Sequence, residues 1–376
     1  MKTITFKNQL ISKNNRKLLL GLMAVITLMG CNKDDGVENQ PIPEPTVAVE
    51  TTPEKEIAVF GKWEVTSGQF VIDNSKYVYI NEDNTIDILA EDDLGFKRYI
   101  TTNISVSENQ ITLSGGEVGS SINNYSIEDD ILTIIPPYGT APILLERKTN
   151  DNEASNWIKS IAIINEGVVT WGRDIDIAFD GTFILGYEEA DRNILKINPV
   201  DFSVVETIPT TNSAYAVEIE KSDTSQRQLF QSDNGYSKFK SYIYSSNNLY
   251  YTSIELGPWI GGIASVEPGY LWAASSNNSS LYYYKSNGAL SPGEVLITIP
   301  LDFQPDGLDY QDSFLYVTER NRVHKCQTSP DFKAIETYEI AENNVYGIAY
   351  DGAHFWLSTQ AWGEDGYKLT KVEIPH

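Results

Sequence analysis

The chain has 376 residues, of which 52 are acidic and 28 are basic, so its formal net charge is −24. Hydrophobic residues make up 41% of it, including 22 Tyr and 7 Trp, which is enough for a large packed core and excludes global disorder. The acidic balance argues against a nucleic-acid-binding surface, because phosphate binding requires clustered Lys and Arg. Two Cys and three His are too few for a disulfide scaffold or a rich metal centre, and the sequence predicts no cofactor.

Residues 1–30 have the features of a signal peptide. Five basic and no acidic residues precede an apolar run of 11 residues, Leu18 to Leu28, whereas a membrane-spanning helix needs about 20. The segment that ends this run, Leu-Met-Gly followed by Cys31, resembles a bacterial lipobox. The resemblance implies cleavage after residue 30 and acylation of Cys31, which would anchor the protein to a membrane. The alternative is an ordinary signal peptide followed by a chance Cys.

Three charged residues follow the predicted lipidation site: Lys33, Asp34 and Asp35. A Lys and two acids at this place resemble the export signal of Bacteroidetes lipoproteins, which implies the outer leaflet of the outer membrane, facing the cell exterior. The alternative is a solvated charge cluster at a flexible terminus. Residues 31–57 hold the predicted lipidated Cys and a run rich in Pro, Glu and Thr, and we expect an extended stalk. Because residues 1–30 hold five basic and no acidic residues, the mature chain would carry −29.

Residues 58–148 contain short alternating strands, such as residues 85–89, separated by Asn, Asp, Gly and Ser. About 90 residues of this pattern predict a small up-and-down β-barrel. An early Gly-Lys-Trp segment ending at Trp63 and a late Arg147 resemble the lipocalin-like domains of Bacteroidetes lipoproteins. The resemblance implies that Trp63 closes the barrel floor and that Arg147 packs over its ring. Short strands favour a filled interior over a ligand cavity.

A polar linker, residues 149–157, precedes a repeated pattern in residues 158–376. Each copy opens with small residues and supplies up to four strands, which is typical of a β-propeller blade. The last copy ends after three strands, and we expect residues 160–164 to supply the fourth and close a five-bladed ring. The predicted fold is therefore all-β, a small lipocalin-like barrel followed by a five-bladed propeller. The central aliphatic positions of the copies are 40, 46, 45 and 40 residues apart: Ile177, Val217, Ile263, Leu308 and Ile348.

The repeats resemble the broad NHL and lactonase-like propeller superfamily, in segments such as residues 306–308 and 346–351. This resemblance implies the fold and says little about chemistry. Residues 304–307 also resemble the Asp-bearing segment of gluconolactonase-like propellers, which bind a divalent cation through a Glu, an Asn and an Asp. The expected early Glu is missing, because residues 172–174 read Gly-Arg-Asp, and no Pro-Asn-Gly occurs in the neighbouring blades. Residues 347–351 resemble plant-type glutaminyl cyclases only in generic blade sequence. The sequence therefore predicts no metal site, no catalytic residue and no enzyme.

Loops at one face of the predicted propeller carry aromatic, amide and charged side chains. Such a mixture suits a sugar, a peptide or a protein loop. The alternative is that the Trp and Tyr rings pack between blades and that the charges are solvated. Trp259, Tyr346 and Trp362 are the residues expected to stack on a ligand. The whole candidate ligand or partner face comprises Trp171, Arg173, Asp174, Asn212, Tyr215, Trp259, Asp306, Asn344, Tyr346 and Trp362.

The combination of a tether, two rigid β-domains and no catalytic constellation predicts a binding function. The first expectation is a lipid-anchored, surface-exposed outer-membrane lipoprotein that is a non-catalytic scaffold subunit of a transport, secretion or barrel-assembly complex, with an outer-membrane protein as its partner. The second is a surface module that binds glycans or peptides. The third is a metal-dependent propeller hydrolase, which predicts a cation on the propeller axis.

Overall fold

The computed structural model describes residues 59–374, except 116–119, 138–139, 150–152, 172–174, 211–212, 222–226, 234–236, 254, 258, 288–292, 342, 362 and 364–365. The predicted signal peptide, the stalk and the residues Cys31, Lys33, Asp34 and Asp35 lie outside the described residues. In the part of the chain that is described, no helix combines the length and the apolar character that crossing a membrane requires.

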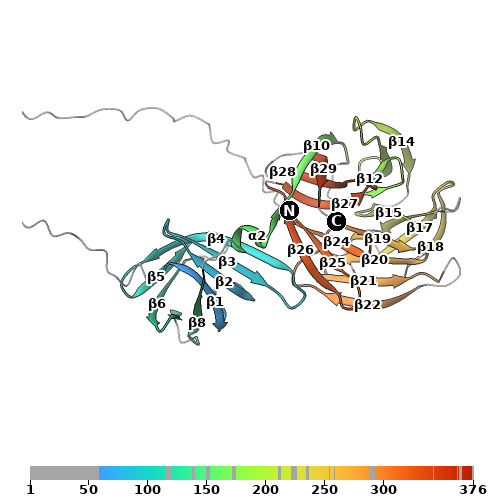
Figure 1. Cartoon of the computed structure of the whole chain (residues 1–376). Coiled ribbons are helices and arrows are strands. Elements are labelled where there is room, and N and C mark those ends of the chain that lie inside the picture. Colours follow the sequence, from blue (N-terminus) through green and yellow to red (C-terminus); the bar gives the residue numbers. More distant parts are fainter. Residues whose placement is uncertain are drawn as a thin grey trace, which may run out of the picture. The chain divides into compact units, whose positions relative to one another are not determined.

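The first part of the described chain is a closed antiparallel barrel of eight strands (Figure 1). Each strand pairs with its sequence neighbour, and the first pairs with the last, so the barrel has no free edge. Alternation places Ile86 and Ile88 inside, where they are fully buried among other apolar side chains of the interior. The strands are β1 (Gly61–Ser67), β2 (Ser75–Ile80), β3 (Thr85–Glu91), β4 (Lys97–Val106), β5 (Gln110–Ser114), β6 (Ser120–Glu128), β7 (Ile131–Ile135) and β8 (Ile143–Lys148).

The Trp63 side chain is fully buried among the apolar side chains of the barrel interior. Its indole N–H donates to the carbonyl oxygen of Val59 at 2.8 Å. The guanidinium carbon of Arg147 lies 4.2 Å from the centroid of the Trp63 ring, the contact that the lipocalin-like resemblance implies. Arg147 also donates to the carbonyl oxygen of Phe60 and pairs with the carboxylate of Asp130, each at 3.0 Å. Several bonds therefore hold the guanidinium over the ring.

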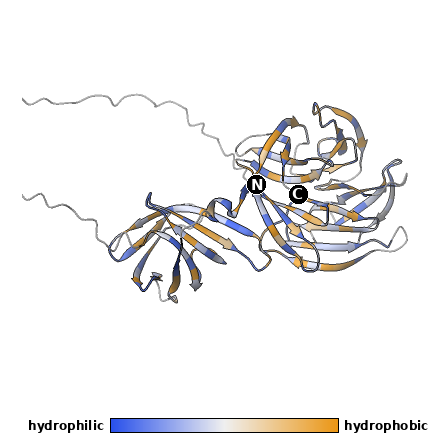
Figure 2. Ribbon diagram, viewed as in Figure 1, coloured by the Kyte–Doolittle hydropathy of each residue, from blue (hydrophilic) through white to orange (hydrophobic). Residues whose placement is uncertain are grey.

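Five antiparallel sheets follow and form the blades of a propeller, which confirms the predicted fold class (Figure 1). In each blade the first strand is innermost, and inner strands of successive blades contact one another around the axis. Apolar residues recur along the strands, where neighbouring blades pack together (Figure 2).

Blade 1 consists of β11 (Ala178–Phe179), β12 (Ile184–Glu188), β13 (Asn193–Ile197) and β14 (Val204–Pro209), and blade 2 of β15 (Val217–Ile219), β16 (Gln228–Asp233), β17 (Lys238–Ile243) and β18 (Asn248–Thr252). Blade 3 consists of β19 (Ile260–Glu267), β20 (Tyr270–Ser275), β21 (Ser280–Lys285) and β22 (Glu294–Pro300), and blade 4 of β23 (Leu308–Gln311), β24 (Phe314–Glu319), β25 (Arg322–Gln327) and β26 (Lys333–Glu339). Blade 5 begins with β27 (Asn343–Tyr350), β28 (Phe355–Ala361) and β29 (Tyr367–Glu373).

The ring closes through the chain segment that precedes the first blade. Strand β10 (Ala162–Val169) pairs antiparallel with β29 and becomes the outer strand of blade 5, as predicted. The segment predicted for this role began two residues earlier and is divided between two blades. Strand β9 (Lys159–Ser160) pairs in parallel with β26 of blade 4. The segment that leads into the propeller therefore pairs with both blade 4 and blade 5.

The short helix α2 (Glu153–Trp157) lies within the predicted linker and packs on the outside of the barrel. Trp157 is buried, and its indole N–H donates to the carbonyl oxygen of Arg98 at 3.0 Å. The β3–β4 turn of the barrel meets blade 4, where Phe96 is buried beside Phe303 with ring centroids 4.8 Å apart. The backbone N–H of Ala334 donates to a carbonyl oxygen of the same turn at 2.7 Å. The start of β4 is thus held against blade 4.

We expect the Asp351 carboxylate in the β27–β28 turn to stabilise the fold above acidic pH. It accepts hydrogen bonds from the backbone N–H groups of Ala353 and His354 at 2.8 and 2.7 Å and from the indole of Trp356 at 2.8 Å. Burial raises the pKa of Asp351, but these bonds outweigh it and hold the pKa below its ordinary value. A lowered folded-state pKa means that the stabilisation is present above the unfolded pKa of about 3.9 and is lost as the pH falls through the folded value.

Asp351→Asn is therefore expected to lower the free energy of unfolding at pH 7 by about 1–3 kcal/mol, measured by urea denaturation. The deficit should shrink at pH values below about 3.9, because wild type then loses the same charge. Asp331→Asn, at an exposed carboxylate of a surface turn, is the control. An Asp351→Asn deficit that stays constant down to pH 2 would contradict the assignment.

Candidate functional site

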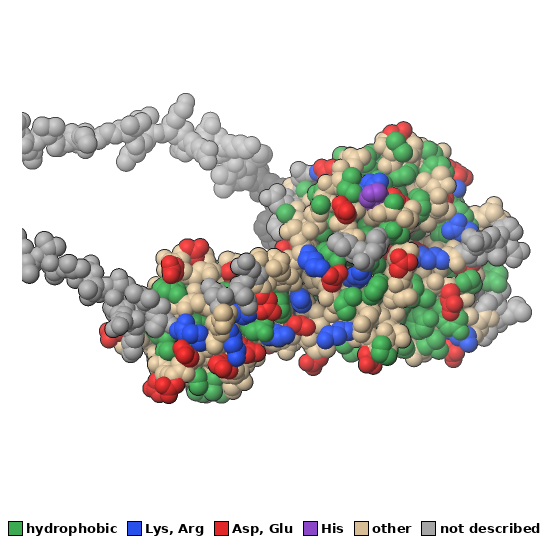
Figure 3. All heavy atoms as spheres, viewed as in Figure 1, with side chains coloured by type: hydrophobic (Ala, Val, Ile, Leu, Met, Phe, Trp, Pro, Cys, Tyr) green, Lys and Arg blue, Asp and Glu red, His purple; other side chains and the backbone are tan. Residues whose placement is uncertain are grey.

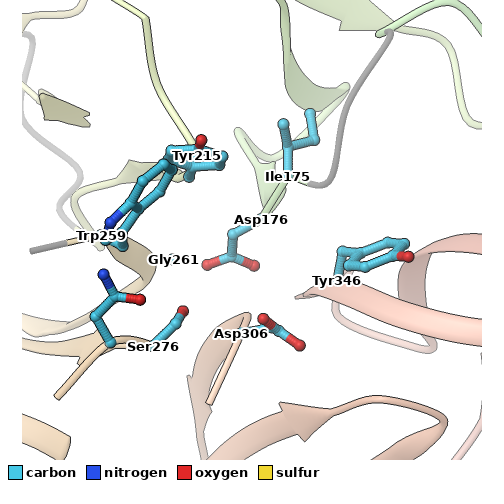
Figure 4. A pocket seen from close by; sticks show the side chains of 9 residues that line it. Ile175, Asp176, Tyr215, Trp259, Gly261, Ser276, Asp306 and Tyr346 are labelled. Atoms are coloured by element: carbon cyan, nitrogen blue, oxygen red, sulfur yellow. The ribbon is translucent and has the colours of Figure 1, made fainter. Parts of the chain in front are cut away.

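A cavity of about 240 Å³ opens on the propeller axis, where residues from all five blades meet (Figure 4). Four residues of the predicted face line it: Tyr215, Trp259, Asp306 and Tyr346. Tyr215, Trp259 and Asp306 precede the innermost strands β15, β19 and β23, and Tyr346 lies within β27. Blade repetition therefore brings together positions far apart in the sequence. The other lining residues are Ile175, Asp176, Gly261, Ser276 and Asn277.

The Asp176 carboxylate lies at the centre of this cavity's floor and is fully buried (Figure 4). One oxygen, Oδ1, accepts backbone N–H bonds from Ile177 at 3.0 Å and Ile348 at 3.1 Å. The other, Oδ2, accepts them from Ile263 at 3.1 Å and Leu308 at 3.2 Å. These donors belong to blades 1, 5, 3 and 4, and all four are central aliphatic positions of the repeat. One side chain thus fastens four blades.

The remaining blade, blade 2, is bonded to the same residue through the main chain. The backbone N–H of Asp176 donates to the carbonyl oxygen of Tyr215, before β15 of blade 2, at 2.7 Å. Every blade is therefore bonded to Asp176 through its carboxylate or its main chain. A second buried carboxylate also joins two blades. Glu218 of blade 2 accepts a hydrogen bond from the backbone N–H of Ser265 of blade 3 at 3.3 Å.

Glycine makes the close approach at the axis possible. A Cβ at Gly307 would lie 2.5 Å from the Cα of Gly347 and 2.6 Å from Oδ1 of Asp176. A Cβ at Gly347 would lie 2.5 Å from the carbonyl oxygen of Ile175. Real Cβ atoms do not approach so closely, so any side chain at these two positions would push the blades apart.

Burial raises the pKa of Asp176 well above its ordinary value, although the amide bonds from Leu308, Ile348 and Ile263 oppose that rise. An ionised carboxylate has about four acceptor sites and no donor, which matches the four N–H groups directed at it. With its oxygens occupied in this way, Asp176 holds the blades together and is not positioned as a proton donor or acceptor for a ligand.

Two aromatic rings form one wall of the cavity. The centroids of Tyr215 and Trp259 are 5.1 Å apart, with the planes inclined at 50°. Trp259 remains 44% exposed, although most Trp side chains described here are buried. Its φ of 60° lies in the left-handed region, which is unfavourable for a bulky residue. The backbone therefore carries strain in a place where it presents an indole ring to solvent.

Polar groups form the opposite wall (Figure 4). The Asp306 side chain lies between Ser276 and Tyr346 around the opening. The Ser276 hydroxyl donates to the carbonyl oxygen of Pro305 at 2.9 Å, which joins the β20–β21 turn to the loop that bears Asp306. The Tyr346 hydroxyl donates to Oε1 of Gln360 at 3.2 Å. The cavity thus combines aromatic faces with hydrogen-bonding groups.

Of the remaining residues of the predicted face, two are described and do not line the cavity, Asn344 and Trp171. Asn344 does not line the cavity, and its amide donates to the Tyr346 hydroxyl at 3.3 Å, so it positions that ring. The prediction for Trp171 was wrong. Its side chain is fully buried between blades, and a Cβ at Gly186 would overlap its ring, so it is a core residue that no surface ligand can reach. Four residues lie outside the described part of the chain: Arg173, Asp174, Asn212 and Trp362.

Sequence reasoning missed Asp176, although a signal was present. The residue before the central aliphatic is Ala216 in the second copy and Gly262, Gly307 and Gly347 in the later copies, but it is Asp176 in the first. An acid at a position otherwise reserved for the smallest residues points to a special place on the axis. Among the described residues, no group of three or more His, Cys, Asp or Glu side chains gathers closely enough to hold a metal ion.

No protein-family model and no curated protein sequence matches the chain. Among solved structures, glutaminyl cyclase from Myxococcus xanthus is similar over 57% of this chain and 96% of that one, with 11% identity and a TM-score of 0.45. A PQQ-bound aldose sugar dehydrogenase from Streptomyces coelicolor covers 57% of this chain and 98% of its own, with 10% identity and a TM-score of 0.36. The WD40 β-propeller domain of Doa1 covers 83% and 97%, with 9% identity and a TM-score of 0.37. Similarity this low carries no argument about activity and leaves an enzymatic role open.

The bonding of Asp176 predicts a large effect of an isosteric change. Asp176→Asn replaces one acceptor oxygen by an NH₂ group that faces two backbone N–H donors. We expect the free energy of unfolding to fall by about 2–5 kcal/mol, because each buried donor left without an acceptor costs about 1–3 kcal/mol. Guanidinium denaturation followed by Trp fluorescence measures this, with Asp331→Asn as the control. Wild-type stability in Asp176→Asn would show that the axis does not depend on this carboxylate.

Proposed function

We propose that this protein is a membrane-tethered binding protein that takes a polar ligand, a glycan or a peptide, in the axial pocket without catalysing a reaction. The observation that carries the proposal is the exposed, strained Trp259 at the mouth of a cavity lined by three aromatic rings and several polar side chains. Ligand sites typically combine an apolar surface with a few polar groups that fix orientation. An aromatic side chain that is exposed to solvent on a strained backbone is typical of a functional position.

The geometry favours binding over catalysis as follows. The carboxylate at the floor, Asp176, is occupied by four backbone N–H groups. This leaves Asp306 as the carboxylate that faces a ligand among the described lining residues. Hydrolysis by a carboxylate pair would need two such groups placed across the bound ligand. A carboxylate at this place can accept hydrogen bonds from a ligand's hydroxyl or N–H groups.

We expect Trp259→Ala to weaken ligand binding. Removing an aromatic contact worth about 1.4 kcal/mol corresponds to a tenfold loss of affinity. The ligand is first selected by screening the purified chain on glycan and peptide arrays, and its affinity is then measured by isothermal titration calorimetry. Tyr270→Ala is the control, because Tyr270 stacks on Tyr283 within blade 3 and does not line the cavity. Equal affinities for wild type and Trp259→Ala would place the ligand elsewhere.

The tether is proposed from the N-terminal sequence. Acylation of Cys31 would fix the chain to the outer membrane, and Lys33, Asp34 and Asp35 would direct it to the outer leaflet, so that residues 31–57 hold the folded part away from the bilayer. A pocket displayed in this way would meet ligands from outside the cell.

Assembly with an outer-membrane partner protein is a second proposal, and exposed apolar side chains favour it. Hydrophobic side chains reach the surface between acidic and basic ones (Figure 3). On the outer strand β10, Ile163, Ile164 and Val168 are exposed, and Val168 is 71% exposed. A Cβ at Gly167 of β10 would overlap the ring of Phe202 in the β13–β14 turn, so the apolar edges of blades 5 and 1 adjoin. Such patches often serve as protein interfaces.

The membrane tether and the outer-membrane partner can both be tested in native membranes. The C-terminally tagged wild type should fractionate with membranes and, after mild detergent extraction, co-purify with an outer-membrane protein in stoichiometric amount. Cys31→Ala should move the protein out of the membrane fraction because the acyl chains are absent, and Val168→Asp should reduce co-purification without releasing the tether. A wild-type chain that emerges alone from mild detergent would contradict the partner proposal.

A further inference from the structure

A second, larger hollow adjoins the axial pocket, and Asp306 lines both. This hollow, the junction groove, has a volume of about 870 Å³. The axial pocket alone, at about 240 Å³, is smaller than the roughly 300–1,000 Å³ typical of ligand sites, whereas the groove lies within that range. A ligand that fills the axial pocket can therefore continue past Asp306. The groove's walls include Arg98, Tyr99 and Thr101 of β4 and Gln304, Arg320 and Asn321 of blade 4.

The barrel supplies a fixed wall of this groove. The segment from Arg98 to Thr101 begins two residues after Phe96, which is buried among apolar side chains of blades 3 and 4. Arg98 also pairs with Asp302 of the propeller at 2.8 Å. Because these contacts hold the start of β4 in place, the groove exists before a ligand arrives, which lowers the entropic cost of binding.

The charges of the groove are largely paired within the protein. Its lining holds three Arg and four carboxylates. Besides the Arg98 pair, Nε of Arg322 lies 3.5 Å from the Glu339 carboxylate, and the Asn321 amide donates to the same carboxylate at 2.9 Å. A charged ligand would have to displace such pairs. An uncharged ligand rich in hydroxyl groups can add hydrogen bonds to them without breaking any.

We propose that the axial pocket and the junction groove together bind a neutral oligosaccharide. One sugar ring lies in the axial pocket with its C–H face on Trp259, and the following rings run past Asp306 into the groove, where β4 of the barrel forms one wall. This inference rests on the proposed function and names its ligand. A peptide that binds by adding a strand to a sheet edge is less suitable, because that mode depends on main-chain hydrogen bonds, whereas the groups described here are side chains.

The test is a length series of a neutral oligosaccharide. The series is chosen from the neutral glycans that the wild-type chain retains on a glycan array, and single-ring to six-ring members are titrated by calorimetry. We expect affinity to rise with length by about tenfold or more until the groove is filled, a change of about 1.4 kcal/mol. The single ring should already bind, through the axial pocket.

Variants separate the two parts of the site. Trp259→Ala should weaken binding of every length. Thr101→Arg and Gln304→Ala, at exposed positions of the two groove walls, should leave the single ring unaffected and remove the gain with length. Ser105→Arg is the matched control, because Ser105 is an exposed residue on the same face of β4 that does not line the groove. Thermal melting confirms that each variant is folded.

The outcomes of these titrations separately test the groove, the class of ligand and the proposed function. Affinity that is independent of length, or Thr101→Arg binding the long members as wild type does, overturns the groove while leaving the axial pocket as a binding site. Retention of charged glycans or peptides alone overturns the ligand class. No retention on either glycan or peptide arrays overturns the proposed function together with this inference.

Discussion

The Asp176 carboxylate is the contact on which the propeller depends. A five-bladed ring must bring five inner strands close to one axis, where their backbone N–H groups lose access to water and need acceptors. Asp176 supplies two oxygens to the amides of Ile263, Leu308 and Ile348 as well as to the amide of its own neighbour. Both oxygens of a carboxylate can accept hydrogen bonds, whereas an amide side chain has only one acceptor oxygen, so a carboxylate suits this place better than an amide would.

The same arrangement creates the cavity above it. Gly307 and Gly347 let the blades close around Asp176, whereas the residues that precede the inner strands β15 and β19 include large side chains, those of Tyr215 and Trp259. The inner strands of the propeller therefore lie close together at the floor of the cavity and leave space at its mouth. The four hydrogen bonds to Asp176 fix the floor before a ligand binds, so the floor adds little ordering cost to binding.

The barrel is a packed body that contributes an outer surface to the candidate site. Its interior is occupied by buried apolar side chains around Trp63, with Arg147 over the indole ring. Its part in binding would come from β4, which Phe96 and Arg98 hold against blade 4. The barrel would then act here through its outer surface, as the wall of a groove shared with the propeller.

The sequence by itself determined the architecture, because strand alternation and a repeat of 40 to 46 residues are local properties that predict a barrel and five blades. It also placed Tyr215, Trp259, Asp306 and Tyr346 on one face, since repeat positions coincide in a ring. Only the tertiary structure decided that Trp171 is buried between blades and that Asp176 bonds the amides of distant blades. Burial and hydrogen-bond partners depend on which residues meet in the folded ring. For Asp176 the partners lie in segments more than 80 residues away, beyond the reach of any local pattern.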